Sequence, residues 1–169
     1  KAKVDELIAN AGFENHTFVQ PPFYFQNLTG MMGAQTQQDG SIGWTLPINP
    51  SVKGIHMSDI NDLGKVVAGA FLHPDKVGDG SYLSLATELN SYNDILDAFK
   101  ANGKEYSFNQ VPTEVFSTFF EGAGEIAQML AYFEEHTYMG PNPEGQIQLA
   151  KEIATEEFTS LNEWIKHNN

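Results

Sequence analysis

Only two stretches of this 169-residue sequence, near Val19 and Leu83, have the length and apolar character of buried strands. Helical patterns alternate with them, which is typical of an α/β protein with a parallel or mixed sheet. Parallel strands are covered on both faces and need neighbours, and a two-stranded sheet is not a viable core. We therefore expect further strands to pair with these two, and we interpret the chain as one half of a larger fold.

The first of these strands is predicted over His16–Gln20 and ends at Pro21 and Pro22. It is followed by Phe23-Tyr24-Phe25-Gln26-Asn27, and it is preceded by a helical pattern over 3–11 with Gly12 as its C-cap. In open α/β sheets, ligands bind outside the carboxyl ends of the strands. Aromatic walls and an amide suit a pocket for a flat ring. An ordinary aromatic core under a loop would show the same pattern, and the residues alone leave both interpretations open.

The second of the two strands is predicted over 82–86, and shorter strands are predicted over 41–46, 54–57 and 105–111. One helix is predicted to start in a variant capping box formed by Asp59 and Asp62, and another starts at Ser91 with Asp94 at N3. We expect the first of these helices to turn five side chains inward: Leu63, Val66, Val67, Ala70 and Phe71. Two helical stripes follow Thr113, with a loop over 138–145 and a last helix after Thr159. The first stripe consists of Phe116, Phe119 and Phe120.

Composition excludes several classes of protein. The formal net charge is -13 and the chain contains no Arg, so we expect no direct contact with nucleic acid. Without Cys there is no thiol nucleophile or thiolate metal site. The five His lack the spacing of metal ligands, and no glycine-rich phosphate loop follows a strand. No stretch is apolar enough to cross a bilayer, and we expect a cytoplasmic protein with no membrane contact.

Four strings in this order resemble the C-terminal half of NmrA-like proteins, which are atypical relatives of the short-chain dehydrogenases. They are Lys1-Ala2-Lys3-Val4-Asp5-Glu6-Leu7, Pro22-Phe23-Tyr24-Phe25-Gln26-Asn27, Met57-Ser58-Asp59-Ile60 followed after one residue by Asp62-Leu63-Gly64, and Thr159 with Glu163-Trp164. The resemblance runs from Lys1 to Trp164. It implies an α/β fold that is the C-terminal portion of a Rossmann-type NAD(P)-binding fold, with a smaller and mostly helical substrate lobe.

The resemblance also implies site residues. Lys1 matches the catalytic Lys of short-chain dehydrogenases, which holds the cofactor ribose, and the loop Pro22–Asn27 matches the segment that borders the nicotinamide. We therefore expect Lys1, Pro22, Phe23, Tyr24 and Asn27 to line a cleft for NADP or NAD, with no metal. The glycine fingerprint for the cofactor belongs to the N-terminal Rossmann half, which we take to be the partner of this chain. Gln20 stands where many relatives have an Arg.

On this basis we divide the chain into residues 1–29 and 75–90, which complete a Rossmann sheet, and residues 30–74 and 91–169, which form the smaller lobe. The expected function is an NAD(P)H-dependent oxidoreductase with a small-molecule substrate, or a redox sensor with a regulatory protein partner. The alternative is a stand-alone interaction module without cofactor. In that case the aromatic edge and the stripe of Phe116, Phe119 and Phe120 would form a surface for a partner.

Overall fold

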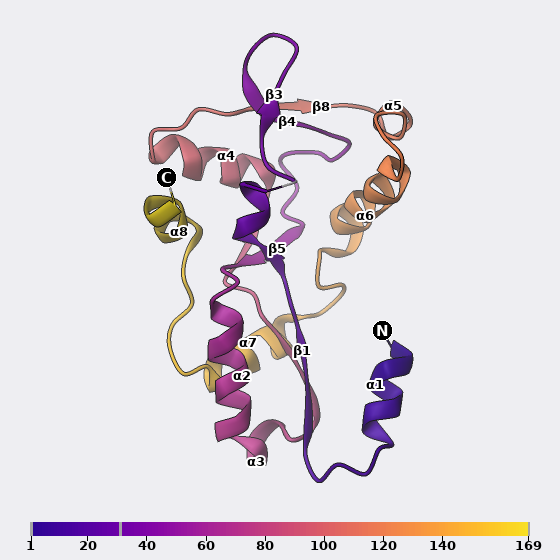
Figure 1. Ribbon diagram of the computed structural model, residues 1–169, viewed down its shortest axis with the longest axis vertical. Helices are drawn as coiled ribbons and strands as arrows, with labels where there is room; N and C mark the ends of the chain where they lie inside the picture. The colour runs from indigo at the N-terminus through magenta and orange to yellow at the C-terminus, as the bar shows by residue number, and fades with distance from the viewer. Residues whose placement is uncertain (1, 31, 169) are drawn as a thin grey trace.

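The computed structural model describes residues 2–30 and 32–168, which form an elongated molecule with a narrow lower half and a broader upper half (Figure 1). The helices are α1 (Ala2–Ala9), α2 (Asp62–Leu72), α3 (Pro74–Val77), α4 (Tyr92–Ala101), α5 (Thr113–Phe116), α6 (Ala123–His136), α7 (Glu144–Ile153) and α8 (Leu161–Asn168), with a 3-10 turn η1 (Phe25–Leu28). The strands are β1 (His16–Gln20), β2 (Phe23–Tyr24), β3 (Gln35–Thr36), β4 (Ile42–Leu46), β5 (Ile55–Ser58), β6 (Asp79–Ser84), β7 (Glu88–Asn90) and β8 (Ser107–Gln110).

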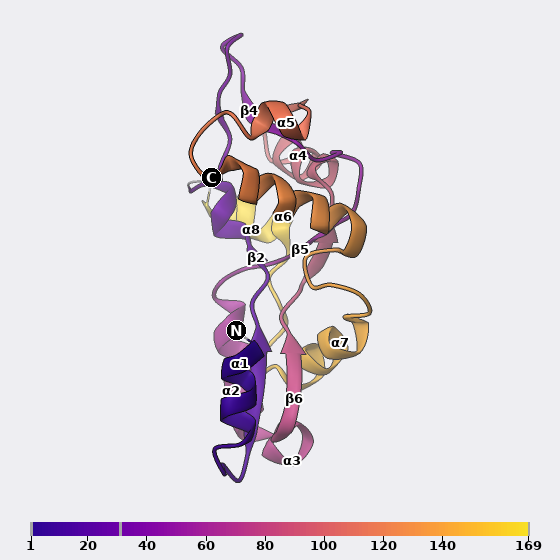
Figure 2. The same cartoon turned by 90° about the vertical axis from the view of Figure 1, so that its right-hand side faces the viewer.

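The lower half is built on the two predicted strands. β1 and β6 run parallel, with Val19 opposite Leu83, and Figure 2 shows them side by side. The rings of Phe18 and Tyr82 stack across the pair, with 4.8 Å between their centroids. Helices α1 and α2 flank β1 on opposite sides (Figure 1). The predicted α/β architecture with a parallel pair is therefore confirmed.

A separate core cluster holds the lower half together. Its buried members include Val66 of α2, Leu83 of β6 and Ile153 of α7. A Cβ at Gly69 would overlap the carbonyl oxygen of Ile153, so glycine is what lets α2 and α7 approach so closely. Both helices come from segments that our division assigned to the smaller lobe, yet they pack on the β1–β6 pair.

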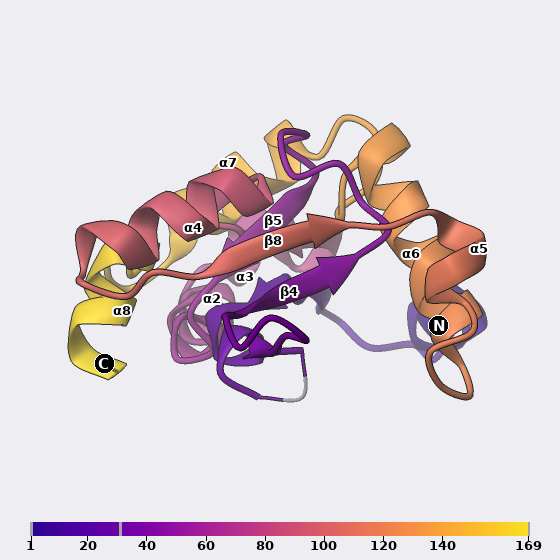
Figure 3. The same ribbon diagram turned by 90° about the horizontal axis from the view of Figure 1, so that it is seen from above.

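The upper half contains two three-stranded sheets. One has the order β2-β5-β7 and the other β3-β4-β8, and Figure 3 shows β4 and β8 lying side by side. The main core cluster lies between these sheets and the helices α4, α6 and α8. It includes Trp44, Met57, Ile95, Leu130 and Trp164.

Two helix starts and one helix end follow local sequence signals. Ser91 and Asp94 form the predicted capping box at α4. Gly12 has a φ of 78°, a left-handed conformation that favours glycine after a helix. Ser160 and Glu163 form a second reciprocal pair at α8, where Ser160 Oγ donates to Glu163 Oε2 over 2.7 Å and Glu163 N donates back to Ser160 Oγ.

Several details of the prediction were wrong. Phe71 is 82% exposed, because it lies five residues and therefore about 140° around the helix from the buried Val66. The helix α5 ends at Phe116, so Phe119 and Phe120 do not continue its face and are half-exposed. Helix α7 was missed, because its buried face amounts to little more than Ala150 and Ile153 among polar residues.

Candidate functional site

The segment after β1 joins the two halves of the molecule. Pro22 is buried, and β2 pairs in parallel with β5, with Phe23 opposite Met57 and Tyr24 opposite Ser58. The chain thus leaves one sheet at Gln20 and enters another at Phe23. The carboxyl end of β1 opens onto this crossing point, where the sequence predicted a ligand.

Successive side chains of this segment point to different cores, as alternation along a strand requires. Phe23 and Phe25 belong to the main core of the upper half, and Phe25 contacts Trp164 with 5.9 Å between ring centroids. Tyr24 packs against the core of the lower half and stays half-buried. The Phe23 side chain therefore does not face a groove in this structure, whereas Tyr24 and Asn27 keep accessible surface.

Gln26 connects this segment to the residues just before α2 by two hydrogen bonds. Its Nε2 donates to Asp59 Oδ1 over 2.8 Å, and its Oε1 accepts the backbone N–H of Ile60 over 3.1 Å. Asp59 also accepts from the backbone and side chain of Asn61. These bonds give the turn η1 a defined position beside the carboxyl end of β1.

Asp62 also connects separate segments by hydrogen bonds, and it does not take part in the capping box that we predicted. Its side chain has 0% exposure and accepts from Ser58 Oγ at 3.2 Å and from the backbone N–H of Thr159 at 3.0 Å. Its Oδ1 lies 2.9 Å from Lys65 Nζ. The N-cap of α2 is Asn61, whose side chain makes no capping bond. The carboxylates at 59 and 62 therefore connect distant segments instead of closing a helix end.

The predicted site residues fall into three groups. Lys1 lies outside the described residues. Pro22 and Phe23 are buried, while Tyr24 and Asn27 are half-buried with side chains that form no hydrogen bond to the described part of the chain. Burial raises the pKa of the Tyr24 hydroxyl, so it stays protonated at neutral pH and can donate. Among the predicted site residues, the accessible groups are thus one phenol and one amide.

Sequence reasoning missed the polar residues that hold the edge in place. Ser84 Oγ at the end of β6 lies 2.8 Å from Gln20 Oε1 and 2.9 Å from Gln146 Oε1. Gln20, which replaces an expected Arg, therefore bridges the carboxyl ends of β1 and β6. A Gln or Ser at the end of a strand is common and forms no recognisable local motif, so the sequence does not predict this role.

The described residues place two limits on the site. Residues 2–30 and 32–168 contain no group of three His, Asp or Glu side chains that could hold a metal ion. Within the same residues no helix has the length and apolar character needed to span a bilayer. The tyrosine and amide at the edge can contact a ring or donate hydrogen bonds, but they offer no cradle for phosphates.

The fold defines an α/β protein in which the segment that carries the accessible Tyr24 and Asn27 lies where β1 ends. The sequence profile of the NmrA-like family matches residues 1–165, and the chain belongs to that family. The match covers nearly the whole chain and confirms the resemblance described above. No curated protein sequence matches the chain significantly.

Solved structures show the same fold. The chain is similar to NmrA, a negative transcriptional regulator, in complex with NAD, at 20% identity and a TM-score of 0.74. It is also similar to NmrA in complex with NADP, at 20% identity and a TM-score of 0.73. A nucleoside-diphosphate-sugar epimerase from Staphylococcus aureus is similar at 17% identity and a TM-score of 0.62. In each case the match covers 98% of this chain and 56% of the other chain, so this chain spans little more than half their length.

Proposed function

We propose that this chain forms one wall of an NAD(P)-binding cleft and that an N-terminal Rossmann half of the same protein forms the other. The observation that carries the proposal is the open edge of β1. Within the described residues β1 pairs with β6 alone, and a two-stranded parallel sheet is too small to be stable by itself. An unpaired strand edge is a ready site for further strands.

The surface beside that edge supports the same proposal. Helix α1 carries the apolar stripe of Val4, Leu7 and Ile8, yet none of its residues is buried, and Leu7 is 70% exposed. Phe13, in the turn after the helix, is exposed as well. Contiguous exposed apolar residues beside an open strand edge are typical of an interface. Helices and strands of a Rossmann half would cover both features at once.

The residues present indicate which part of the cofactor each half would contact. This chain supplies no glycine-rich phosphate loop, so the phosphates would bind to the other half. Tyr24 and Asn27 would contact the ring end of the dinucleotide from the carboxyl end of β1. Lys1 would hold the ribose, as the family resemblance implies. The dinucleotide, when bound, supplies a hydride donor or acceptor at that edge.

The family allows an NAD(P)H-dependent oxidoreductase or a redox sensor, and the two make different predictions. In an oxidoreductase, Lys1 would lower the pKa of an upstream Tyr, which would protonate the reduced substrate. A sensor would keep the binding and lack the acid. Incubating the protein that includes the N-terminal half with NADPH and a quinone or aldehyde tests the choice. Turnover supports the oxidoreductase, and binding without turnover supports the sensor.

Calorimetry tests the binding proposal itself. The protein that includes the N-terminal half should bind NAD or NADP, and this 169-residue chain alone should not. Tyr24→Ala and Asn27→Ala should each weaken binding, by about three- to tenfold if one contact is lost, while the exposed Asn93→Ala should not. Equal affinity in the Tyr24 and Asn27 variants, or dinucleotide binding by the isolated chain, would overturn the proposal.

A further inference from the structure

A large pocket opens in the upper half, away from the segment that joins the two halves. It lies between the β3–β4 hairpin, strand β8 and the region of α5, and its volume is about 1060 Å³. Pockets of about 300–1,000 Å³ are usual for small molecules. The pocket is formed by residues 32–126 alone, so it does not depend on a second half of the fold.

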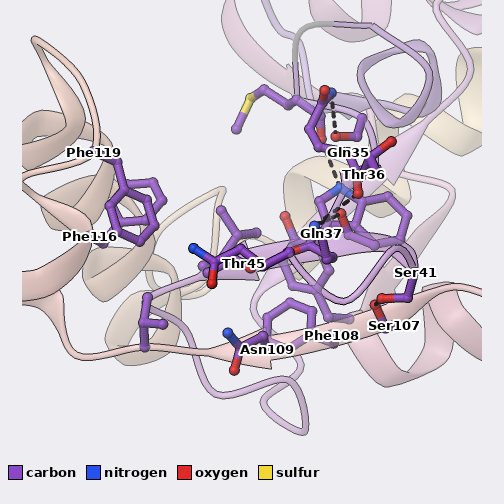
Figure 4. A pocket seen from close by; sticks show the side chains of 18 of the residues that line it. Gln35, Thr36, Gln37, Ser41, Thr45, Ser107, Phe108, Asn109, Phe116 and Phe119 are labelled. Atoms are coloured by element: carbon purple, nitrogen blue, oxygen red, sulfur yellow. Dashed lines mark hydrogen bonds between the residues drawn. The ribbon is translucent and has the colours of Figure 1, made fainter.

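One side and the floor of the pocket are aromatic. Tyr92 packs on Phe108 with 4.9 Å between ring centroids, and Trp44 lies 6.0 Å from Tyr92. Phe116 and Phe119 pack on each other at 5.4 Å, and Figure 4 shows them on one side of the pocket, across from the hairpin. Phe119 is half-exposed. These surfaces favour a planar ligand, which can stack on the rings.

The opposite wall is polar, but its groups bind one another. Thr45 Oγ1 donates to Gln37 Oε1 over 2.6 Å. Gln37 Nε2 in turn donates to the carbonyl oxygens of Gln35 at 2.9 Å and Gly43 at 2.8 Å. This network, drawn in Figure 4, stiffens the hairpin and leaves little hydrogen-bonding capacity for a ligand.

Charge is nearly absent from the lining. None of the residues that line the pocket is Lys or His, and Asp39 is the one acidic residue among them. The carboxylate of Asp39 already accepts from the backbone and hydroxyl of Ser41. A charged ligand would lose hydration against the aromatic rings without gaining a counter-charge. The pocket therefore favours an uncharged ligand.

The hydroxyl of Tyr92 is the polar group of the lining that can bond to a ligand. It is 1% exposed and lines the pocket, and its hydroxyl forms no hydrogen bond with any residue that the structure describes. Among the described residues, the fully buried side-chain atoms without a hydrogen-bond partner are His56 Nδ1 and Trp164 Nε1. The Tyr92 hydroxyl therefore keeps a small accessible surface, through which it can donate to a ligand. Burial also raises the pKa of this hydroxyl, so it remains a donor over the whole physiological range.

We propose that this pocket binds an uncharged planar molecule with a carbonyl oxygen, which accepts a hydrogen bond from the Tyr92 hydroxyl while its ring packs on Phe108 and Trp44. The inference goes beyond the proposed dinucleotide cleft, because it needs only side chains of this chain.

Three probes with the same ring test the proposal by calorimetry on the 169-residue chain. They are methyl 2-naphthyl ketone, 2-naphthoate and 2-naphthylmethylammonium, compared in about 0.5 M salt so that the net charge of the protein is screened. The ketone should bind about tenfold more tightly than either ion. Preference for the ammonium would point to Asp39 and overturn the proposal, as would equal affinities or no binding.

Tyr92→Phe removes only the hydroxyl and keeps the ring. The ketone should bind this variant about three- to tenfold more weakly, which corresponds to the usual contribution of one hydrogen bond to the binding free energy. Its folding stability should change little, because the lost hydroxyl forms no hydrogen bond within the described residues. Tyr132→Phe, a half-exposed tyrosine on α6 outside the pocket lining, is the matched control and should leave ketone affinity unchanged. Unchanged affinity in Tyr92→Phe, or equal losses in both variants, would refute the assignment.

Discussion

Replacing Asp62 with alanine should destabilise the fold strongly, because this carboxylate connects three segments. It accepts from Ser58 at the end of β5, from Thr159 before α8, and from Lys65 on its own helix. Removing one partner of a buried ion pair costs about 3–5 kcal/mol. Lys65 is one-fifth exposed and also donates to the carbonyl oxygen of Glu157 at 2.7 Å. We therefore expect a loss near the lower end, about 3 kcal/mol, in the free energy of unfolding.

Urea denaturation, followed by the fluorescence of the buried Trp44 and Trp164, measures this loss. Asp97→Ala is the matched control, because Asp97 is exposed on α4 and should change stability by less than about 0.5 kcal/mol. A double-mutant cycle with Lys65→Met should show a coupling of about 1 kcal/mol or more between the two side chains. A loss below about 1 kcal/mol in Asp62→Ala would show that the connection carries no stability, and the reasoning would fail.

Two further predictions concern a helix start and a buried histidine. Ser91→Ala removes the capping box of α4 and should cost about 1 kcal/mol in urea denaturation, whereas an unchanged midpoint would contradict the role of this cap. Burial lowers the pKa of His56, opposed by a smaller effect of Glu144, so the folded chain binds its proton less readily than the unfolded chain. The free energy of unfolding should therefore fall as pH drops below about 6.5. His56→Gln should flatten the slope between about pH 7 and 5.5, and an unchanged slope would refute this origin.

Local signals in the sequence predicted many of the elements. The strand over His16–Gln20 matches β1, and the capping box at Ser91 starts α4. Such features depend on side chains a few residues apart, so the sequence carries them directly. The predicted family also needed only the order of short motifs along the chain. The missed helix α7 shows the limit, because its polar surface and small buried face produce little periodic signal.

The candidate site was predictable only in outline. The segment 22–27 lies at the carboxyl end of β1, as expected, but the division of its side chains between two cores was not predictable. Whether Phe23 or Tyr24 faces accessible space depends on the pairing of β2 with β5. That pairing joins residues more than thirty positions apart, and no local pattern specifies it. The Tyr92 pocket likewise combines a hairpin, a strand and a helix from separate parts of the chain.

By itself the sequence determined the α/β class, the parallel strands at Val19 and Leu83, and the shortage of strands around them. These follow from apolar periodicity and from the number of strands that a sheet needs. The tertiary structure alone decided that Asp62 and Gln26 connect distant segments by hydrogen bonds. It also decided that Tyr92 lines a pocket with a hydroxyl that bonds to no other described residue. The reason is physical: burial and hydrogen bonding between distant segments depend on how the chain packs, which local side-chain patterns do not encode.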